Sequence, residues 1–423
     1  MVPIDEPGVT KAVEEIHPSH LPQTDKDLIA KGLQQLVEHS LPSKGHGDVT
    51  QCIHGSAQSP AVWLGKLIPE LEELASKYHI GNFVAIRGTN QRFFENMPIY
   101  VRLGMHLLFY GPDQVKLLEG SKLIQDFLKD ISIRQGEIYD SPESVKNIPS
   151  FIQTYNIQLD ELLEPDIDNY RTFNQFFYRR LKPGVRPVQN MDNPKGFCSM
   201  ADCRLVVYQT IDLAEKFWIK GDEFSIPTLL DLVPSDPLCE TLKGGSLAIF
   251  RLAPQDYHRF HSPVDGTLLG VPRDIAGQYY TVNPQAVNEP TFDVFTRNKR
   301  SVLLLEHEVL KKPIAIIAIG ALMVGSITWT PIKQVKRGDE LGHFAYGGST
   351  VVAIFPPGVI RFDDDLVQNS MGVGPTGAKE GSIETLMKVG YSLGMIPDER
   401  TSFNFIPRSW LRRCRALLGG QRG

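Results

Sequence analysis

Cysteine is scarce in this chain, which has five among 423 residues. No two of them form a CxxC pair, so the sequence predicts neither a disulfide framework nor a structural zinc site, and a reducing compartment suits this usage best. An excess of one charge sign is also lacking, since 44 Lys and Arg face 49 Asp and Glu for a formal net charge of −5. This balance gives no reason to expect a nucleic-acid partner.

Long hydrophobic runs are missing as well. The most apolar stretch, residues 313–324, is too short to cross a bilayer and is typical of a buried strand. Residues 1–15 are polar and acidic, with neither the apolar core of a signal peptide nor the arginine-rich pattern of a transit peptide. We therefore expect a cytoplasmic protein whose contact with a membrane, if it has one, is peripheral.

Two segments would carry such a peripheral contact. Residues 96–110 predict an apolar helix, which either packs on the catalytic core, the interpretation we prefer, or faces lipid with Arg102 and His106 at its polar edge. Residues 407–423 place five arginines beside Trp410 and several leucines. This tail is either a solvated, frayed end or a basic amphipathic segment that meets anionic lipid.

The pattern along the chain predicts an α+β fold, with a β-rich catalytic core and a helical N-terminal region. We place the helical accessory region at residues 1–165 and the core domain at residues 166–423. Apolar, β-branched runs bounded by Gly and Pro predict the strands of this core. They lie at residues 204–209, 246–251, 267–271, 301–306, 313–319, 326–330 and 350–355.

Helices are expected at both ends of the core. Thr172 is a suitable N-cap for a helix that buries Phe173, Phe176 and Phe177. Residues 382–393 predict a late helix.

One glycine-rich stretch interrupts two apolar runs. Gly347-Gly348-Ser349-Thr350 is followed by a short, β-branched segment that ends at Pro356. Two glycines permit a tight backbone path, which would place the Ser349 hydroxyl at the mouth of a buried strand. Taken alone, this stretch is most simply a hairpin turn with an incidental serine.

Two further stretches change that interpretation. They are Cys198-Ser199-Met200-Ala201-Asp202-Cys203-Arg204 and Asp256-Tyr257-His258-Arg259-Phe260-His261-Ser262-Pro263. Together with the Gly-Ser segment they resemble the PADxR, YHRFHxP and GST motifs of the phosphatidylserine decarboxylase family. The resemblance covers about residues 140–395 and includes Leu181-Lys182-Pro183-Gly184-Val185-Arg186-Pro187. Met200 and Cys203 depart from the usual family residues, and neither replaces a group that the chemistry needs.

The resemblance implies a self-processing carboxy-lyase. Enzymes of this family cut themselves at a Gly-Ser bond, here between Gly348 and Ser349, and the two resulting chains stay associated. Ser349 then becomes a covalent pyruvoyl group, so no external cofactor and no metal are expected. The substrate amine forms a Schiff base with this carbonyl, which accepts the electrons left on the α-carbon when carbon dioxide leaves.

The resemblance also suggests roles for the polar residues. It makes His261 the base that activates Ser349, with Asp202 as the carboxylate that orients it, and it assigns His258 to decarboxylation. From the residues alone the HxxH pair stays ambiguous between a metal pair, a catalytic pair and a structural histidine. Asp265 is a rival for the acidic role, although a turn aspartate that caps its own backbone is the simpler interpretation.

Four functions remain open at this point. The first is conversion of phosphatidylserine to phosphatidylethanolamine and carbon dioxide. The second is pyruvoyl-dependent decarboxylation of a soluble amino acid or a metabolite derived from one. The third, a serine hydrolase that uses Ser349, His261 and Asp202, lacks a G-x-S-x-G elbow. The fourth, an inactive homologue, is disfavoured by the complete residue set.

Overall fold

The computed structural model describes the part of the chain that forms the core. These residues are 81–89, 91–96, 129, 133, 136–217, 219, 224–280, 282, 287, 293–321, 326–345, 349–373 and 382–398. The predicted apolar helix at 96–110, apart from Asn96, and the predicted basic tail at 407–423 lie outside the described residues. Within the described part, no helix is both long enough and apolar enough to cross a membrane.

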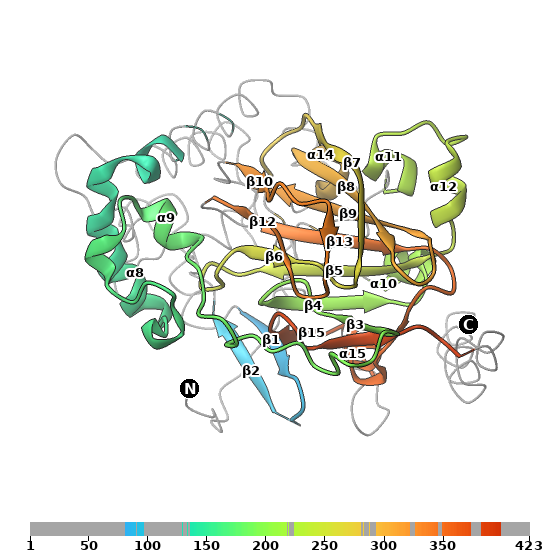
Figure 1. Ribbon diagram of the computed structural model, residues 1–423, viewed down its shortest axis with the longest axis horizontal. Helices are drawn as coiled ribbons and strands as arrows, with labels where there is room; N and C mark the ends of the chain where they lie inside the picture. Colours follow the sequence, from blue (N-terminus) through green and yellow to red (C-terminus); the bar gives the residue numbers. More distant parts are fainter. Residues whose placement is uncertain are drawn as a thin grey trace, which may run out of the picture.

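A ten-stranded mixed sheet dominates the described part of the chain (Figure 1). Its spatial order is β11-β7-β8-β9-β13-β5-β4-β15-β1-β2. In chain order its strands are β1 (Gly81–Ile86), β2 (Arg92–Asn96), β4 (Cys203–Tyr208), β5 (Ser246–Leu252), β7 (Gly266–Ile275), β8 (Arg300–His307), β9 (Pro313–Gly320), β11 (Gln334–Val335), β13 (Ser349–Phe355) and β15 (Glu384–Met387). Strand β13 therefore lies inside the sheet, antiparallel to both β9 and β5.

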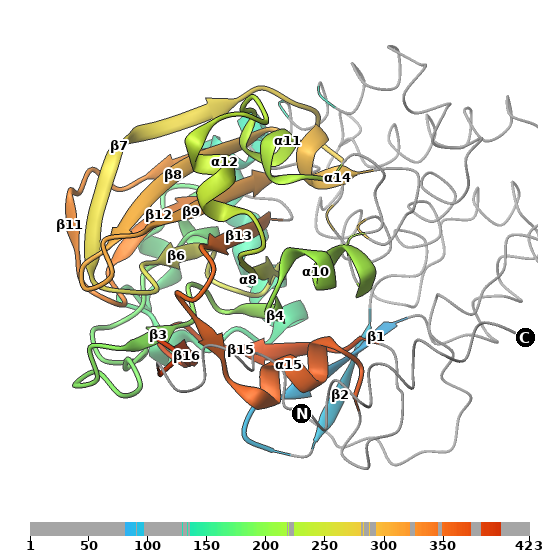
Figure 2. The ribbon, with the colours of Figure 1, turned by 90° about the vertical axis from the view of Figure 1, so that its right-hand side faces the viewer.

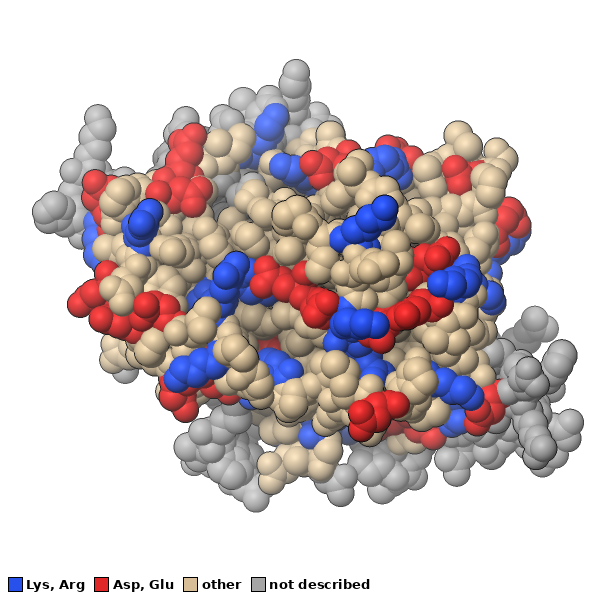
Figure 3. Space-filling model, in the orientation of Figure 1, with Lys and Arg blue, Asp and Glu red and all other residues tan. Residues whose placement is uncertain are grey.

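Two small sheets and several short helices surround this sheet. The small sheets join β10 (Ile327–Trp329), β12 (Glu340–Phe344) and β6 (Arg259–His261), and β14 (Arg361–Phe362), β16 (Ser392–Met395) and β3 (Gly196–Cys198). The helices are η3 (Pro142–Asn147), α8 (Ile148–Tyr155), η4 (Leu159–Glu161), η5 (Ile167–Asn169), α9 (Phe173–Phe177), α10 (Ile211–Phe217), α11 (Ile226–Leu230), α12 (Pro237–Leu242), α14 (Val294–Arg297) and α15 (Asp364–Ser370). Over the face shown in Figure 3, acidic and basic side chains are interspersed.

The described structure confirms the α+β fold and all seven predicted strands, within a few residues at their ends. The Thr172 side chain accepts a hydrogen bond from the amide of Gln175 and caps α9, as predicted. Helix α9 buries Phe173, Phe176 and Phe177 in an aromatic cluster that is separate from the core of the sheet.

The predicted late helix at residues 382–393 is wrong. This segment forms β15 and the start of β16, which are separated by Gly390 with a φ of +84°. Strand β15 is buried between β4 and β1, so pairing on both sides outweighs the local helical pattern. A side chain at position 390 would also meet the carbonyl oxygen of Pro187, at 2.6 Å from a Cβ.

Within the described residues, part of the N-terminal region forms strands where accessory helices are expected. Strands β1 and β2 form a hairpin that joins the edge of the large sheet, because β1 pairs in parallel with β15 (Figure 2). The division at residues 165 and 166 stays a prediction, but strands β1 and β2 share the large sheet of the core domain.

Candidate active site

Ser349 is the first residue of β13 and is completely buried. Its neighbours across the sheet are Leu252 on β5 and Gly320 on β9. Gly347 and Gly348 lie outside the described residues. Pairing with β5 and β9 thus fixes the backbone of β13 from Ser349 onward. Ser349 lies at the end of the strand, beside the ends of its two neighbours.

The Ser349 hydroxyl contacts His258. The distance between Ser349 Oγ and His258 Nδ1 is 2.9 Å, and the other ring nitrogen, Nε2, lies 3.0 Å from the carbonyl oxygen of Ala253. A carbonyl oxygen can only accept, so Nε2 carries the proton of the neutral ring. Nδ1 then presents its lone pair to Ser349, and the serine hydroxyl donates to it. This is the geometry of a base beside its nucleophile.

The backbone at His258 is unusual. Its φ of +53° lies in the left-handed region, which residues other than glycine rarely adopt. A turn in which the Asp256 amide donates to the Ala253 carbonyl, at 2.9 Å, and the hydrogen bond from the Phe344 amide to the His258 carbonyl, at 2.9 Å, hold this conformation. Phe177 stacks on the imidazole with ring centroids 3.9 Å apart. Such strained residues concentrate at functional sites, where the surrounding structure compensates their cost.

The surroundings of His258 keep it neutral. Burial, reinforced by the nearby positive charge of Arg179, lowers the pKa of His258 to about 3. At neutral pH the ring is therefore free to accept a proton, and neutrality is maintained far below the pH at which an ordinary histidine becomes charged.

His261 lies in a different environment. Its Nδ1 donates to the carbonyl oxygen of Gly338 at 2.8 Å, so its Nε2 accepts from the Tyr257 hydroxyl. Burial lowers the pKa of His261 and raises that of Tyr257. Among the hydrogen bonds of the described residues, none joins His261 to Ser349.

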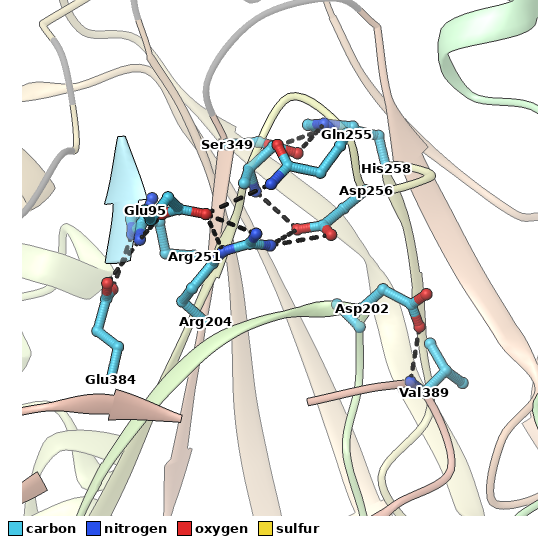
Figure 4. Close-up of polar contacts among 12 residues, drawn as sticks. Glu95, Asp202, Arg204, Arg251, Gln255, Asp256, His258, Ser349, Glu384 and Val389 are labelled. Carbon is cyan, nitrogen blue, oxygen red and sulfur yellow. Dashed lines mark hydrogen bonds and ion pairs between the residues drawn. The ribbon is translucent and has the colours of Figure 1, made fainter. Parts of the chain in front are cut away.

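Asp202 is engaged elsewhere. Arg186 donates to both of its carboxylate oxygens, at 2.7 to 3.1 Å, and the Val389 amide donates to Oδ1 at 2.8 Å. In Figure 4 Asp202 lies apart from Ser349 and points toward Val389. The structure thus brings Ser349 and His258 together, whereas the expected contacts from Asp202 to His261 and from His261 to Ser349 are absent from the described hydrogen bonds.

The surroundings of Cys203 and Asp265 can be compared with what the sequence suggests for them. Cys203, one of the two departures from the usual family residues, is fully buried, and burial raises its pKa well above the ordinary value, which disfavours a reactive thiolate. In the part of the chain that the structure describes, Asp265 does not cap its own backbone as expected, and its Oδ1 instead accepts from the Arg337 amide at 2.7 Å. Sequence reasoning missed Arg186 as the partner of Asp202, although Arg186 stands in a stretch of recognised resemblance, and it missed Ala253, whose backbone carbonyl leaves no sequence signal.

Beside this site lies an ionic cluster, which we define as Glu95, Arg204, Arg251, Asp256 and Glu384 (Figure 4). Arg251 pairs with Glu384 at 2.5 Å, and both arginines pair with Glu95, Arg204 at 2.5 Å and Arg251 at 3.0 Å. The guanidinium groups, acting against burial, hold the pKa of Glu95 at about 2. The cluster is therefore a network of buried ion pairs centred on Glu95 and the two arginines.

Comparison with known proteins places this geometry in context. The sequence model of the family described as "Phosphatidylserine decarboxylase" matches residues 173–375. The chain is 41% identical over 344 residues to phosphatidylserine decarboxylase proenzyme 2 of Komagataella phaffii, covering 80% of this chain and 32% of the relative. It is 44% identical over 310 residues to proenzyme 3 of Schizosaccharomyces pombe, covering 73% of this chain and 30% of the relative.

A bacterial relative is covered almost completely. The phosphatidylserine decarboxylase proenzyme of Fusobacterium nucleatum is 35% identical over 292 residues, which are 69% of this chain and 90% of the relative. By contrast, the chain spans about a third of the length of the two yeast relatives it matches.

Proposed function

The chain belongs to the phosphatidylserine decarboxylase family, and we propose that it cuts itself between Gly348 and Ser349 and then converts phosphatidylserine to phosphatidylethanolamine and carbon dioxide. The contact between Ser349 Oγ and His258 Nδ1 is the observation that carries this proposal. In this proposal Ser349 and His258 carry the chemistry and Asp202 and His261 support it, within the domain of residues 166–423.

The contact supports a defined first step. Ser349 Oγ transfers its proton to Nδ1 of His258 and attacks the carbonyl carbon of Gly348. The protonated imidazole passes this proton to the leaving nitrogen of residue 349, so the C–N bond breaks and an ester replaces the peptide. Loss of the proton on Cα of residue 349 then expels the Gly348 carboxylate. The dehydroalanine left at the new terminus takes up water and releases ammonia, which leaves a pyruvoyl group.

The site suits such a group, since position 349 is buried, begins a central strand and lies against a neutral imidazole. The pyruvoyl carbonyl supplies the acceptor for the substrate amine and for the electrons released with carbon dioxide. In the mature enzyme the imidazole of His258 remains beside residue 349, where its Nδ1 can take up the proton that decarboxylation consumes and pass it to the substrate's α-carbon. Phe177 stacks on one face of the His258 ring and helps to hold its orientation.

The roles of the two histidines follow from their hydrogen bonds. The resemblance assigned proton acceptance to His261, but its Nε2 is occupied by the Tyr257 hydroxyl, while Nδ1 of His258 faces the serine. We therefore assign proton acceptance to His258, in addition to its expected role in decarboxylation. His261, together with Tyr257, holds the loop that carries His258. Asp202 neutralises Arg186 and receives the Val389 amide, so it fastens the segment after β15 to the site.

The two chains of the mature protein would stay associated through the sheet. The smaller chain would comprise residues 349–423. It would retain β13 between β9 and β5, and β15 between β4 and β1, as strands of the same sheet as the larger chain. Every residue of β13 is buried, so separation would expose a continuous apolar strand.

The test of this function is carbon dioxide release by the purified, processed protein. Phosphatidylserine vesicles and free serine are supplied at equal molar concentrations of serine carboxylate. The Ser349→Ala chain serves as the blank. Release from vesicles alone supports the lipid substrate, and co-sedimentation with the same vesicles tests a peripheral membrane contact. Release from free serine alone would replace phosphatidylserine by a soluble substrate, and release from neither would overturn the proposal.

A further inference from the structure

A chain of contacts runs from His258 into the ionic cluster. The carbonyl of Ala253 accepts from His258 Nε2, and the amide of Ala253 donates to Oδ2 of Asp256 at 2.7 Å. Asp256 also donates its own amide to the Ala253 carbonyl at 2.9 Å. The Asp256 carboxylate thus closes the turn whose carbonyl fixes the tautomer of the catalytic imidazole.

Arg204 holds Asp256 in place. Its Nη1 lies 3.0 and 2.8 Å from the two carboxylate oxygens of Asp256, and its own side chain is 3% exposed. Burial raises the pKa of Asp256 to about 6 against the opposing effect of Arg204. The arginine is therefore what keeps this carboxylate charged and directed at the turn near neutral pH.

The opposite side of Arg204 is held by Glu95. Arg204 Nε donates to Glu95 Oε1 at 2.7 Å, and Glu95 also accepts from Arg251. Glu95 belongs to β2 of the N-terminal hairpin, outside the region 173–375 that the family model matches. A strand that the sequence analysis assigned to the accessory region therefore contributes Glu95 to the ionic cluster beside the active site (Figure 4).

Stability alone is a poor explanation for this network. Replacing buried ion pairs by apolar groups is often neutral or stabilising, because the desolvation of the charges offsets their attraction. A network of charge-assisted hydrogen bonds does, however, fix side chains in one geometry. Here that fixed geometry ends at an imidazole whose backbone is in a strained, left-handed conformation.

We propose that Glu95, Arg204 and Asp256 are positioning residues that orient His258 through the Ala253 turn, so that the N-terminal hairpin completes the active site. The inference rests on the proposed function, because its readouts are self-cleavage and decarboxylation. It predicts that removing the charge of Glu95 slows the chemistry at residue 349 without displacing the hairpin.

The hairpin supplies its own control. Arg87, in the turn after β1, forms ion pairs with Asp363 at 2.5 Å and Asp365 at 3.1 Å, away from the ionic cluster. Glu95→Gln and Arg87→Gln each remove one charge from the same hairpin, and only the first change lies on the path to His258. If the hairpin matters merely by docking on the sheet, the two variants behave alike.

The experiment follows self-cleavage of the full chain during cell-free translation, as the ratio of cut to uncut protein over time. We expect Glu95→Gln to slow cleavage about tenfold, since misplacing a catalytic group by about 1 Å costs up to about 100-fold in rate. We expect Arg87→Gln to cleave at the wild-type rate. Equal slowing of both variants, or unchanged cleavage of Glu95→Gln, would overturn the inference.

A double-mutant cycle separates positioning from general destabilisation. Glu95→Gln and Asp256→Asn act on one path, so the double variant should be scarcely slower than Asp256→Asn, whereas independent effects multiply. Arg204→Lys, which keeps the charge without the planar fork, should recover part of the rate lost in Arg204→Gln. If the rate losses of Glu95→Gln and Asp256→Asn multiply in the double variant, the two residues do not act on one path. A rate for Arg204→Lys as low as that of Arg204→Gln contradicts the shared path as well. Failure of the wild-type chain to cut would instead refute the proposed function, so the two failures are distinct.

In the processed enzyme, Glu95→Gln should lower kcat for phosphatidylserine vesicles and leave KM unchanged, because the network acts on the imidazole of His258 through the Ala253 turn. A change confined to KM contradicts positioning of His258.

Discussion

The two ends of strand β13 differ sharply in what surrounds them. At its start, Ser349 and Thr350 are buried beside a histidine and the ionic cluster. From Val351 to Phe355 the same strand is surrounded by apolar side chains of the sheet core. The start of the strand places Ser349 beside His258, and the far end holds the strand in the apolar core. Changes at the start should therefore abolish function in an intact fold, and changes at the far end should lower stability while the chemistry persists.

Removal of the serine hydroxyl gives the largest expected effect. Ser349→Ala should leave the chain uncut and without decarboxylase activity, because no nucleophile remains for the peptide bond. Gel electrophoresis and carbon dioxide release measure this, and circular dichroism should show the wild-type fold. Cleavage of the Ser349→Ala protein would contradict this contrast between the two ends of β13. It would show that the Ser349 hydroxyl is not the nucleophile.

Replacement of each histidine sharpens the assignment at this end. His258→Ala should slow self-cleavage by about 100-fold or more, the scale of a lost general base. His261→Ala, which leaves Nδ1 of His258 facing Ser349, should slow it less. The two rates come from the same cell-free time course. The reverse order, with His258→Ala fully cut and His261→Ala uncut, would return proton acceptance to His261.

The far end of the strand is tested by a cavity. Ile354 is fully buried, so Ile354→Ala should cost about 2–5 kcal/mol of unfolding free energy. Denaturant unfolding in a Ser349→Ala background keeps a single uncut chain and so allows a direct comparison. With Ser349 present, the Ile354→Ala protein that folds should still be cut. Loss of cleavage in folded protein would mean that the two ends are not separable.

The pH dependence gives the smallest effect. His258, with its pKa lowered to about 3, should not limit self-cleavage near neutrality, whereas Asp256, with its pKa raised to about 6, takes up a proton as the pH falls. The wild-type rate should therefore be full above about pH 7 and decline toward about pH 5. Asp256→Asn should be slower at every pH but without this decline. A decline that persists in Asp256→Asn would point to a histidine with an ordinary pKa.

Much of the sheet could be predicted from the sequence because its strands are short apolar runs with clear ends. The burial of Ser349 at the start of β13 follows from such a run, and Thr172 caps α9 through a local rule. The helix predicted for residues 382–393 is wrong because β15, which forms there instead, depends on pairing with the distant strands β4 and β1.

The site was harder to predict than the fold. Residues 258 and 261 are three apart, and their relation depends on the left-handed backbone at His258, which no residue type reveals. The partners of Asp202 and Arg204 are likewise fixed by chain segments far away in sequence, such as Val389 and Glu95.

The intact masses of the purified protein test the central claim most directly. The account predicts two chains, the smaller one comprising residues 349–423 and lighter by one ammonia than the unmodified segment, with a terminal carbonyl in place of an amine. A single chain of 423 residues that releases carbon dioxide, or a small chain that begins with an unmodified serine, would contradict it.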